Sequence, residues 1–329
     1  MYGICASGGY IPRNRLSRKS MYGAMGWFNA ANIAYAGGER SVANFDEDSI
    51  TMAVAAVRAT LPKGGDRSSI DGLYFASTSL PYADRQNAGI IATALSLKEG
   101  IRAADFSGSR KAGSTAILAA LDAVAGGSMK EALVCSAECR PALSASPQEM
   151  LYGDAAATVL IGSENVIAEF KGSYSTTHDF VDRYRGSKSL YDKQWEDRWI
   201  RDLGYAPLLG EAVGGLMKKY GLKITDFAAV AYDCHYAPVR KALNKMVALP
   251  KDAEVNNFQE TVGQCGAAHP VMMLARALET AKPGDKILVV SFGSGCDALY
   301  FEVTENIKNA QNLVSLSKSL ARGEKLDTT

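Results

Sequence analysis

The sequence predicts a five-layered fold in the order α/β/α/β/α, made of two duplicated halves. Strand-like apolar runs alternate with helical segments of about a dozen residues, a pattern that is typical of a largely parallel sheet covered by helices. Segment 113–125 is apolar on nearly all sides, so we expect a helix buried between two layers. The third observation is an internal repeat, because motifs of the first half return in the same order in the second.

Two pairs of segments in this repeat share one offset. SIDGLYFAST at 69–78 and ITDFAAVAYD at 224–233 each combine a polar lead, an Asp and an apolar run. The segments that begin GSTAIL at position 113 and AHPVMM at position 268 each indicate a helix, a polar turn and a buried strand. Both pairs are offset by 155 positions, and a shared offset at distant points indicates duplication.

The repeat also predicts the domain organisation. Each half ends in a pair of strands, EALVCSAE with DAAATVLIG and then KILVVSFG with DALYFEV. The polar, aromatic stretch between the halves breaks the pattern, and Trp195 and Trp199 stand at helical i,i+4 spacing, so we expect a cap there. We therefore expect a first half at 1–170, a cap insert at 171–210, a second half at 211–305, and a polar tail at 306–329 that serves for docking or is disordered.

Composition favours an ordinary globular protein in the cytoplasm. The 329 residues are 47% hydrophobic and 22% charged, and the formal net charge of +1 favours neither nucleic acid nor an anionic membrane as partner. No apolar run approaches the roughly 20 residues of a membrane span, and without a charged leader before an apolar core we expect no signal peptide. We expect the six Cys to be reduced, and no metal site, because Cys135 and Cys139 lack a second Cys/His pair.

The turn DFSGSRKA at 105–112 leads into the predicted buried helix and has the form of an active-site turn. A helix N-terminus lowers the pKa of a thiol, so a nucleophile placed there is activated. This turn carries Ser107, Ser109 and Arg110 and no Cys. An arginine is always charged and is no nucleophile, and Ser109 is either a nucleophile or a former of the turn. Two interpretations stay open: an enzyme with an unusual nucleophile, or an enzyme-like subunit without its own chemistry.

Several motifs together resemble the thiolase superfamily, in particular the branch of 3-hydroxy-3-methylglutaryl-CoA synthase and β-ketoacyl-ACP synthase III. The resemblance covers residues 2–305 and implies the five-layered thiolase fold. The motifs that carry it are GICASGGYIPRNRL, STSLPYADRQNAGIIATAL, DFSGSRKAGST, GDAAATVLIG, DCHYAPVRKAL and VSFGSGCDALYFEV.

The resemblance implies four catalytic positions. Members of this branch carry an acyl group on a Cys at the start of the buried helix, and a His and an Asn position the thioester. Synthases of the 3-hydroxy-3-methylglutaryl type add a Glu as general acid/base. The His position falls on His235. The Cys, Glu and Asn positions fall on Arg110, Thr78 and Gln264, so one of the four residue types is kept.

Further candidates follow from the repeat and the resemblance. Cys265 lies 155 positions after Arg110, at the start of the second buried helix. It is either a replacement nucleophile, paired with His269, or a buried structural thiol. Gly293 and Gly295 belong to a tight turn that in this family lends a backbone N–H to the oxyanion hole, or that is kept for packing alone.

The charged candidates have alternatives of their own. Arg185, Lys188 and Arg198 in the cap are candidates for binding CoA phosphates, and a solvated helix face is the alternative. Arg110 either holds an anion at the helix start or pairs with a carboxylate where the nucleophile would stand. His235 is either a donor to a thioester carbonyl or a core histidine.

We expect an acyltransferase-type subunit that lacks the nucleophilic Cys. The resemblance implies a homodimer, or a heterodimer with a catalytic thiolase subunit bridged by a zinc-ribbon/OB-fold protein, as in the multicomponent phloroglucinol acetyltransferase. The alternative is an autonomous condensing or cleaving enzyme of the 3-hydroxy-3-methylglutaryl-CoA synthase type that uses Cys265 or Ser109. A CoA-binding regulatory protein is a third reading. We expect a coenzyme A thioester as substrate, and no covalently bound cofactor, nucleic acid or membrane.

Overall fold

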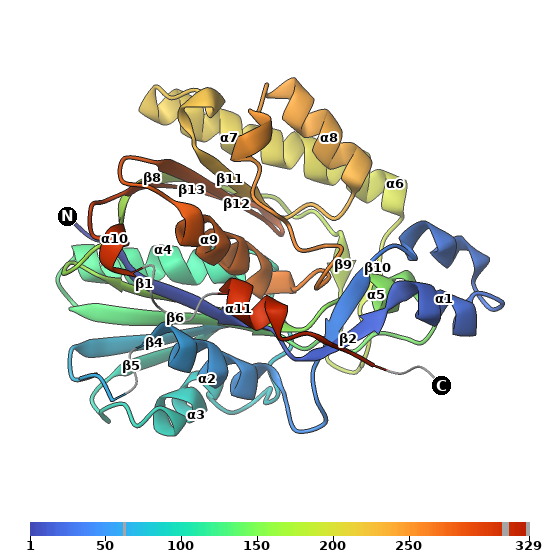
Figure 1. The fold of residues 1–329 in the computed structure, drawn as a ribbon, viewed down its shortest axis with the longest axis horizontal. Coiled ribbons are helices and arrows are strands. Elements are labelled where there is room, and N and C mark those ends of the chain that lie inside the picture. The colour runs from blue at the N-terminus through green and yellow to red at the C-terminus, as the bar shows by residue number, and fades with distance from the viewer. Residues whose placement is uncertain (62–63, 311–315, 327–329) are drawn as a thin grey trace.

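The computed structural model, which describes residues 1–61, 64–310 and 316–326, has five layers (Figure 1). Two sheets alternate with three layers of helices, and the predicted order α/β/α/β/α is confirmed. One helix layer lies between the sheets and two cover their outer faces. In the order outer, central and outer, these layers are α2 (Ser49–Thr60) with α3 (Asn87–Ala94), α4 (Ala112–Ala125) with α9 (His269–Thr280), and α7 (Ala206–Tyr220) with α8 (Ala237–Met246).

Among the described residues, nine strands form one hydrogen-bonded sheet that parts into two. Only two residue pairs, Gly3 with Glu169 and Ile4 with Ala168, join the first strand to the eighth, so the sheet separates there. The order is β11 (Ala229–Tyr232), β12 (Lys286–Phe292), β13 (Gly295–Val303), β8 (Ala168–Thr177), β1 (Gly3–Tyr10), β7 (Ala155–Gly162), β6 (Glu131–Glu138), β4 (Ile70–Ala76) and β5 (Arg102–Phe106).

The predicted duplication is confirmed, because equivalent elements of the two halves keep one offset. β6 and β12 begin 155 positions apart, at Glu131 and Lys286. The two central helices, α4 and α9, pack against each other in the middle layer. The close approach of α4 to the turn that precedes α9 requires a glycine, since a Cβ at Gly113 would lie 2.3 Å from the carbonyl oxygen of Ala267.

The prediction of a largely parallel sheet is wrong, because the sheet is mixed. The pairs β4–β5, β4–β6 and β11–β12 are parallel, whereas the pairs that join the strands closing each half are antiparallel. β12 passes to β13 through only two residues, Gly293 and Ser294. A connection of two residues joins antiparallel neighbours only, since parallel strands need a long crossover.

The cap consists of a small hairpin and a short helix. Glu196 caps this helix and Trp195 precedes it. Contrary to the prediction from their i,i+4 spacing, Trp195 and Trp199 therefore do not lie on one helix. Their rings still meet edge-on with centroids 6.4 Å apart, and Phe180 stacks on Trp199 at 4.2 Å. The elements are β9 (Arg183–Tyr184), β10 (Lys193–Gln194), α6 (Asp197–Trp199) and a π-helical turn, Ile200–Tyr205, that continues into α7.

The predicted tail packs on the body wherever it is described. The Ile11 amide donates to the Ser319 hydroxyl at 2.8 Å, and Leu316 is fully buried. Residues 311–315 and 327–329 lie outside the described residues, and the three boundaries between the four predicted segments stay predictions. The tail elements are α10 (Ile307–Ala310), α11 (Leu316–Ala321) and β14 (Glu324–Lys325), and β14 pairs with β2 (Asn14–Ser17), which pairs with β3 (Glu39–Val42).

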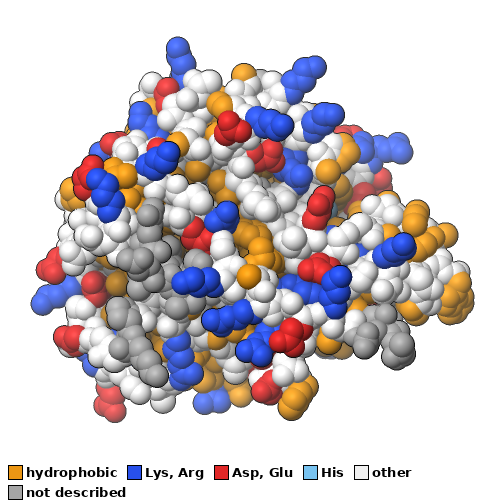
Figure 2. Space-filling view, viewed as in Figure 1, with side chains coloured by type: hydrophobic (Ala, Val, Ile, Leu, Met, Phe, Trp, Pro, Cys, Tyr) orange, Lys and Arg blue, Asp and Glu red, His pale blue; other side chains and the backbone are white. Residues whose placement is uncertain are grey.

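A lobe beside this small sheet projects from the body (Figure 1). Trp27 and Phe28 are exposed side chains of the lobe, and Figure 2 shows hydrophobic side chains gathered at its outer end. No helix in the described ranges is long and apolar enough to cross a membrane. The remaining short elements are α1 (Arg18–Met25), α5 (Pro147–Leu151) and the 3-10 turns Ala30–Tyr35, Ile224–Asp226, Lys251–Ala253 and Gly266–Ala268.

Candidate active site

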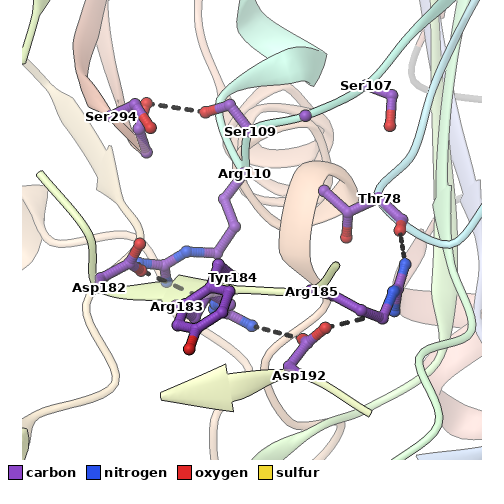
Figure 3. Close-up of a pocket in the computed structure, with 12 residues that line it drawn as sticks. Thr78, Ser107, Ser109, Arg110, Asp182, Arg183, Tyr184, Arg185, Asp192 and Ser294 are labelled. Atoms are coloured by element: carbon purple, nitrogen blue, oxygen red, sulfur yellow. Dashed lines mark hydrogen bonds and ion pairs between the residues drawn. The ribbon is translucent and has the colours of Figure 1, made fainter. Parts of the chain in front are cut away.

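A polar cavity of about 210 Å³ lies at the start of α4 (Figure 3). Its wall comes from the loop after β4, the turn before α4, the cap hairpin and the turn between β12 and β13. None of the lining residues is a Cys or a His, so the wall offers neither a thiol nor an imidazole. The lining residues are Thr78, Ser107, Gly108, Ser109, Arg110, Asp182, Arg183, Tyr184, Arg185, Asp192, Gly293 and Ser294.

Arg110, at the position where the resemblance implies a nucleophilic Cys, extends into a group of acidic and aromatic side chains. Its guanidinium donates to the Asp182 carboxylate and, at 2.6 Å, to the Tyr205 hydroxyl, and it lies 3.8 Å from Asp233. The residue is 4% exposed, and its guanidinium carbon lies 5.0 Å from the ring centroid of Phe292. Of the two roles predicted for Arg110, the contacts are those of a partner for carboxylates.

Ion pairing keeps this buried group charged. Burial opposes the charge of Arg110, but the carboxylates of Asp182 and Asp233 outweigh it and hold the pKa of Arg110 above its usual range. Burial likewise opposes the charge of Asp182, but Arg110 and Arg183 hold the pKa of Asp182 below its usual range. A permanently charged guanidinium does not attack a thioester carbonyl. An ion pair therefore occupies the start of α4.

Ser109 is held in the turn by two hydrogen bonds. Its hydroxyl donates to the Gly293 carbonyl at 2.7 Å and accepts from the Lys111 amide at 3.2 Å. The Gly293 amide donates to the Gly295 carbonyl at 2.8 Å, so this N–H is engaged and not directed at an oxyanion. These contacts favour turn formation for Ser109 and packing for the turn at Gly293 and Gly295.

The contact between the two turns gives a testable prediction. A Cβ at Gly293 would lie 2.6 Å from the Ser109 hydroxyl oxygen and 2.8 Å from the Lys111 amide nitrogen. Because the backbone cannot move aside easily, Gly293→Ala should lower the free energy of unfolding by about 1–3 kcal/mol in urea denaturation. Gly214→Ala in α7 meets no atom within 4 Å and should be neutral or stabilising by up to about 1 kcal/mol. Equal effects of the two substitutions would contradict the packing role.

His235 follows β11 as the resemblance implies, but it does not line the cavity. Its Nδ1 lies 3.4 Å from the Tyr205 hydroxyl, which also contacts Arg110. Burial and the nearby Arg110 guanidinium lower the pKa of His235 to about 3, so the imidazole is neutral at pH 7. Donation from His235 to a thioester carbonyl stays a prediction.

Gln264, at the position of the family's Asn, is buried in a polar network. Its side-chain oxygen accepts from Arg140 at 2.6 Å and from Arg183 at 3.1 Å. Its amide nitrogen donates to Asp233 at 3.1 Å. Gln264 therefore links the second half to the cap and does not reach the cavity wall.

Of the two alternatives for Cys265, the contacts favour the buried structural thiol over a pairing with His269. The thiol donates to the Gly263 carbonyl at 3.5 Å, whereas the His269 imidazole accepts from the Cys265 backbone amide at 3.1 Å. Cys265 is fully buried, and burial raises the pKa of its thiol well above the usual value. The start of the second central helix faces the core between the halves, and this favours the structural role for Cys265.

Glu138 is a fully buried carboxylate whose role was not predicted from the sequence. It accepts from the Thr78 amide and hydroxyl, each at 2.9 Å, from the Ser79 hydroxyl at 2.7 Å, and from the Ala267 amide at 3.0 Å. Thr78, at the position of the family's general acid, thus directs its hydroxyl to Glu138. The carboxylate fixes the loop after β4 to the segment before α9.

The three basic cap residues predicted to bind CoA phosphates lie apart. Arg185 lines the cavity, where it pairs with Asp192 at 3.3 Å and donates to the Thr78 carbonyl. Lys188 and Arg198 are exposed and do not line the cavity. Binding of CoA phosphates by these residues stays a prediction.

Known proteins similar to this chain identify its family. The family model "3-Oxoacyl-[acyl-carrier-protein (ACP)] synthase III C terminal" matches residues 217–300. The hydroxymethylglutaryl-CoA synthase of Pyrobaculum calidifontis is 31% identical over 318 residues, which cover 94% of this chain and 90% of the relative. That of Caldivirga maquilingensis is 33% identical over 313 residues, which cover 93% and 88%. The chain belongs to the hydroxymethylglutaryl-CoA synthase family.

Solved structures share the fold of this family member. An HMG-CoA synthase complexed with CoA superimposes with a TM-score of 0.85 at 18% identity, over 99% of this chain and 88% of that chain. The 3-oxoacyl-[acyl-carrier-protein] synthase III of Aquifex aeolicus gives a TM-score of 0.79 at 20% identity, over 92% and 100%. The resemblance to this branch of the thiolase superfamily is confirmed, and so is the thiolase fold.

The names of the relatives bear on the expected function. Hydroxymethylglutaryl-CoA synthase names an enzyme, so the relatives fit the alternative of an enzyme of this type better than the expectation of a non-catalytic subunit. They leave the multicomponent partnership untested. The hydroxymethylglutaryl-CoA synthase family thus contains a member with Arg110 paired to Asp182 at the start of α4.

The partners of Arg110, namely Asp182, Asp233 and Tyr205, were also not predicted from the sequence. A signal for Asp233 was present, because it stands between the predicted strand and His235. A buried arginine requires a carboxylate partner, so an acid in the cap was to be expected. Which acid fills that role depends on the hairpin, whose form the sequence pattern did not predict.

Proposed function

We propose that this member of the hydroxymethylglutaryl-CoA synthase family supports acyl-CoA condensation as a subunit that carries no acyl group itself. The supporting observation is the ion pair of Arg110 with Asp182, with Asp233 beside it, at the start of α4. The start of a helix lowers the pKa of a thiol placed there and so favours the thiolate. In this chain the guanidinium of Arg110, paired with Asp182, stands at the start of α4. A catalytic thiolase-type partner then supplies the cysteine.

A coenzyme A thioester is the ligand class that we propose for the cavity. At about 210 Å³, the cavity is smaller than the roughly 300–1,000 Å³ of most small-molecule sites. It therefore suits the acyl end of a pantetheine arm and not a whole coenzyme A. The hydroxyl of Ser107 and the guanidinium of Arg185 give its wall donors for carbonyl and amide oxygens.

The second candidate is an autonomous condensing or cleaving enzyme of the hydroxymethylglutaryl-CoA synthase type. The relatives of that name favour it, with identities of 31% and 33% over more than nine-tenths of the chain. Ser109 is the candidate nucleophile for this function, since it lines the cavity at the turn before α4. Cys265 is less suited, because its thiol is buried away from the cavity.

A turnover assay on the purified chain separates the two candidates. Release of the CoA thiol from acetyl-CoA, with and without acetoacetyl-CoA, is followed for the parent chain and for Ser109→Ala. The proposal predicts no release above the buffer blank from either. The second candidate predicts turnover by the parent chain that Ser109→Ala reduces by about 10²-fold or more.

Copurification tests the proposed partnership. A tagged chain, isolated from its native host at low salt, is expected to bring down a second thiolase-fold chain in near-stoichiometric amount. Acyl-CoA turnover is expected in that complex and not in the separated chain. Recovery of the chain alone, together with turnover by the chain alone, would contradict the proposal.

A further inference from the structure

The cap hairpin separates two cavities. Residues 182–185 on its first side line the active-site cavity of about 210 Å³, and residues 191–193 on its second side line a neighbouring cavity of about 250 Å³. Asp192 lines both. The outer cavity is completed by Pro141, Ala142, Leu143, Ser146, Gln148 and Ser189. Each cavity alone is smaller than the roughly 300–1,000 Å³ of a typical ligand site, and the two together reach that range.

One carboxylate fastens the loop of this hairpin. Asp192 accepts from the Tyr152 hydroxyl at 2.8 Å, and its oxygens lie 3.3 Å from the Arg185 guanidinium and 3.8 Å from that of Arg183. Figure 3 shows Asp192 between these two guanidinium groups, with Arg185 directed on to Thr78. Since Tyr152 belongs to the body, Asp192 connects the end of the loop to the body. Through Arg185 it also connects the end of the loop to the beginning of the loop.

Between these anchors the loop makes few contacts with the body of the protein. Within the described structure, the hydrogen bonds of residues 186–191 run among themselves, from the Ser189 amide to the Gly186 carbonyl and from the Ser189 hydroxyl to the Tyr191 carbonyl. Lys188 is exposed and Leu190 is 65% exposed. A segment with few buried contacts opens at low free-energy cost, so the anchors at its base decide its position.

We propose that residues 185–192 form a strap, which opens when the contacts of Asp192 release and joins the two cavities into one channel to the start of α4. The closed strap confines the inner cavity to small groups. The open strap admits a long, narrow group such as an acyl-pantetheine arm. The strap does not depend on the proposed function, because a supporting subunit and an autonomous enzyme both need access to this cavity.

A thiol placed inside the cavity measures this access. In Ser109→Cys, the new thiol is treated with iodoacetamide or with a maleimide attached to a polyethylene glycol chain, and peptide mass spectrometry gives each rate. With the strap intact, the bulky reagent should react about tenfold more slowly than iodoacetamide, after correction for their rates with a free thiol. Adding Asp192→Asn should raise the rate of the bulky reagent about tenfold, since the carboxylate charge that pairs with Arg183 and Arg185 is removed.

Two further variants complete the test. Tyr152→Phe removes the hydroxyl that donates to Asp192, keeps the ring, and should also raise the rate of the bulky reagent. Asp202→Asn neutralises an exposed cap carboxylate that pairs with Arg201, and it should change neither rate. Circular dichroism shows whether each variant is folded. If Asp192→Asn does not fold, Tyr152→Phe alone tests the proposal. Equal access of both reagents with the strap intact, or no acceleration in the folded variants, would overturn the proposal.

Discussion

Arg110→Met is expected to lower the free energy of unfolding by about 3–5 kcal/mol, because it removes one partner of a buried ion pair. Methionine keeps an unbranched apolar stem beside Phe292, so packing is largely retained. Asp182 and Asp233, which are 8% and 1% exposed, lose the guanidinium that offsets their burial. Urea denaturation at pH 7 measures the loss. Arg198→Met, at an exposed cap position, is the control and should stay within about 0.5 kcal/mol of the parent chain.

The same variant has a defined pH dependence. Arg110 and Arg183 outweigh burial and hold the pKa of Asp182 below the reference value of 3.8. A carboxylate whose pKa is lowered by folding stabilises the protein above its unfolded pKa, and this stabilisation is lost as the pH falls through the folded pKa. The difference between parent and Arg110→Met should therefore be full at pH 7 and shrink below about pH 4. A difference that grows on acidification would contradict the ion pair.

Glu138→Ala should cost a similar amount, about 3–5 kcal/mol of the free energy of unfolding. The substitution leaves the amides of Thr78 and Ala267 without their acceptor, and the side chains of Glu138 and Ala267 are fully buried. Glu138→Gln keeps one acceptor oxygen and should recover part of the loss. Glu164→Ala, at an exposed position, should be nearly silent. If Glu138→Ala were as mild as Glu164→Ala in urea denaturation, the carboxylate would not hold the two segments together.

The layers of the fold were predictable because duplication leaves a signal along the chain. The offset of 155 positions recurs in β6 and β12, and the apolar segment 113–125 corresponds to the buried helix α4. Strand direction was not predictable from alternation, since a two-residue turn after Phe292 makes the closing strands antiparallel. The form of the expected cap was not predictable from local propensity, since Glu196 caps the short helix that begins at Asp197, and Trp195 lies outside it.

The candidate site was predictable only where a motif specifies one position. Arg110 lies at the start of α4 as the motif implied, and Thr78 lines the same cavity. Asp182, the partner of Arg110, is 72 residues away from it in sequence, so no spacing rule connects the two residues. Cys265 occupies the equivalent position in the second half, but tertiary packing places its thiol in the core and not in the cavity.

Intact-mass spectrometry after incubation with acetyl-CoA tests most directly whether the start of α4 lacks a nucleophile. The chain is quenched in mild acid, so that an ester or thioester survives, and is compared with Ser109→Ala and Cys265→Ala. We predict an unchanged mass for all three, since the paired guanidinium of Arg110 stands at the nucleophile position. A stoichiometric acetyl adduct on the parent chain, lost in one of the two variants, would contradict this.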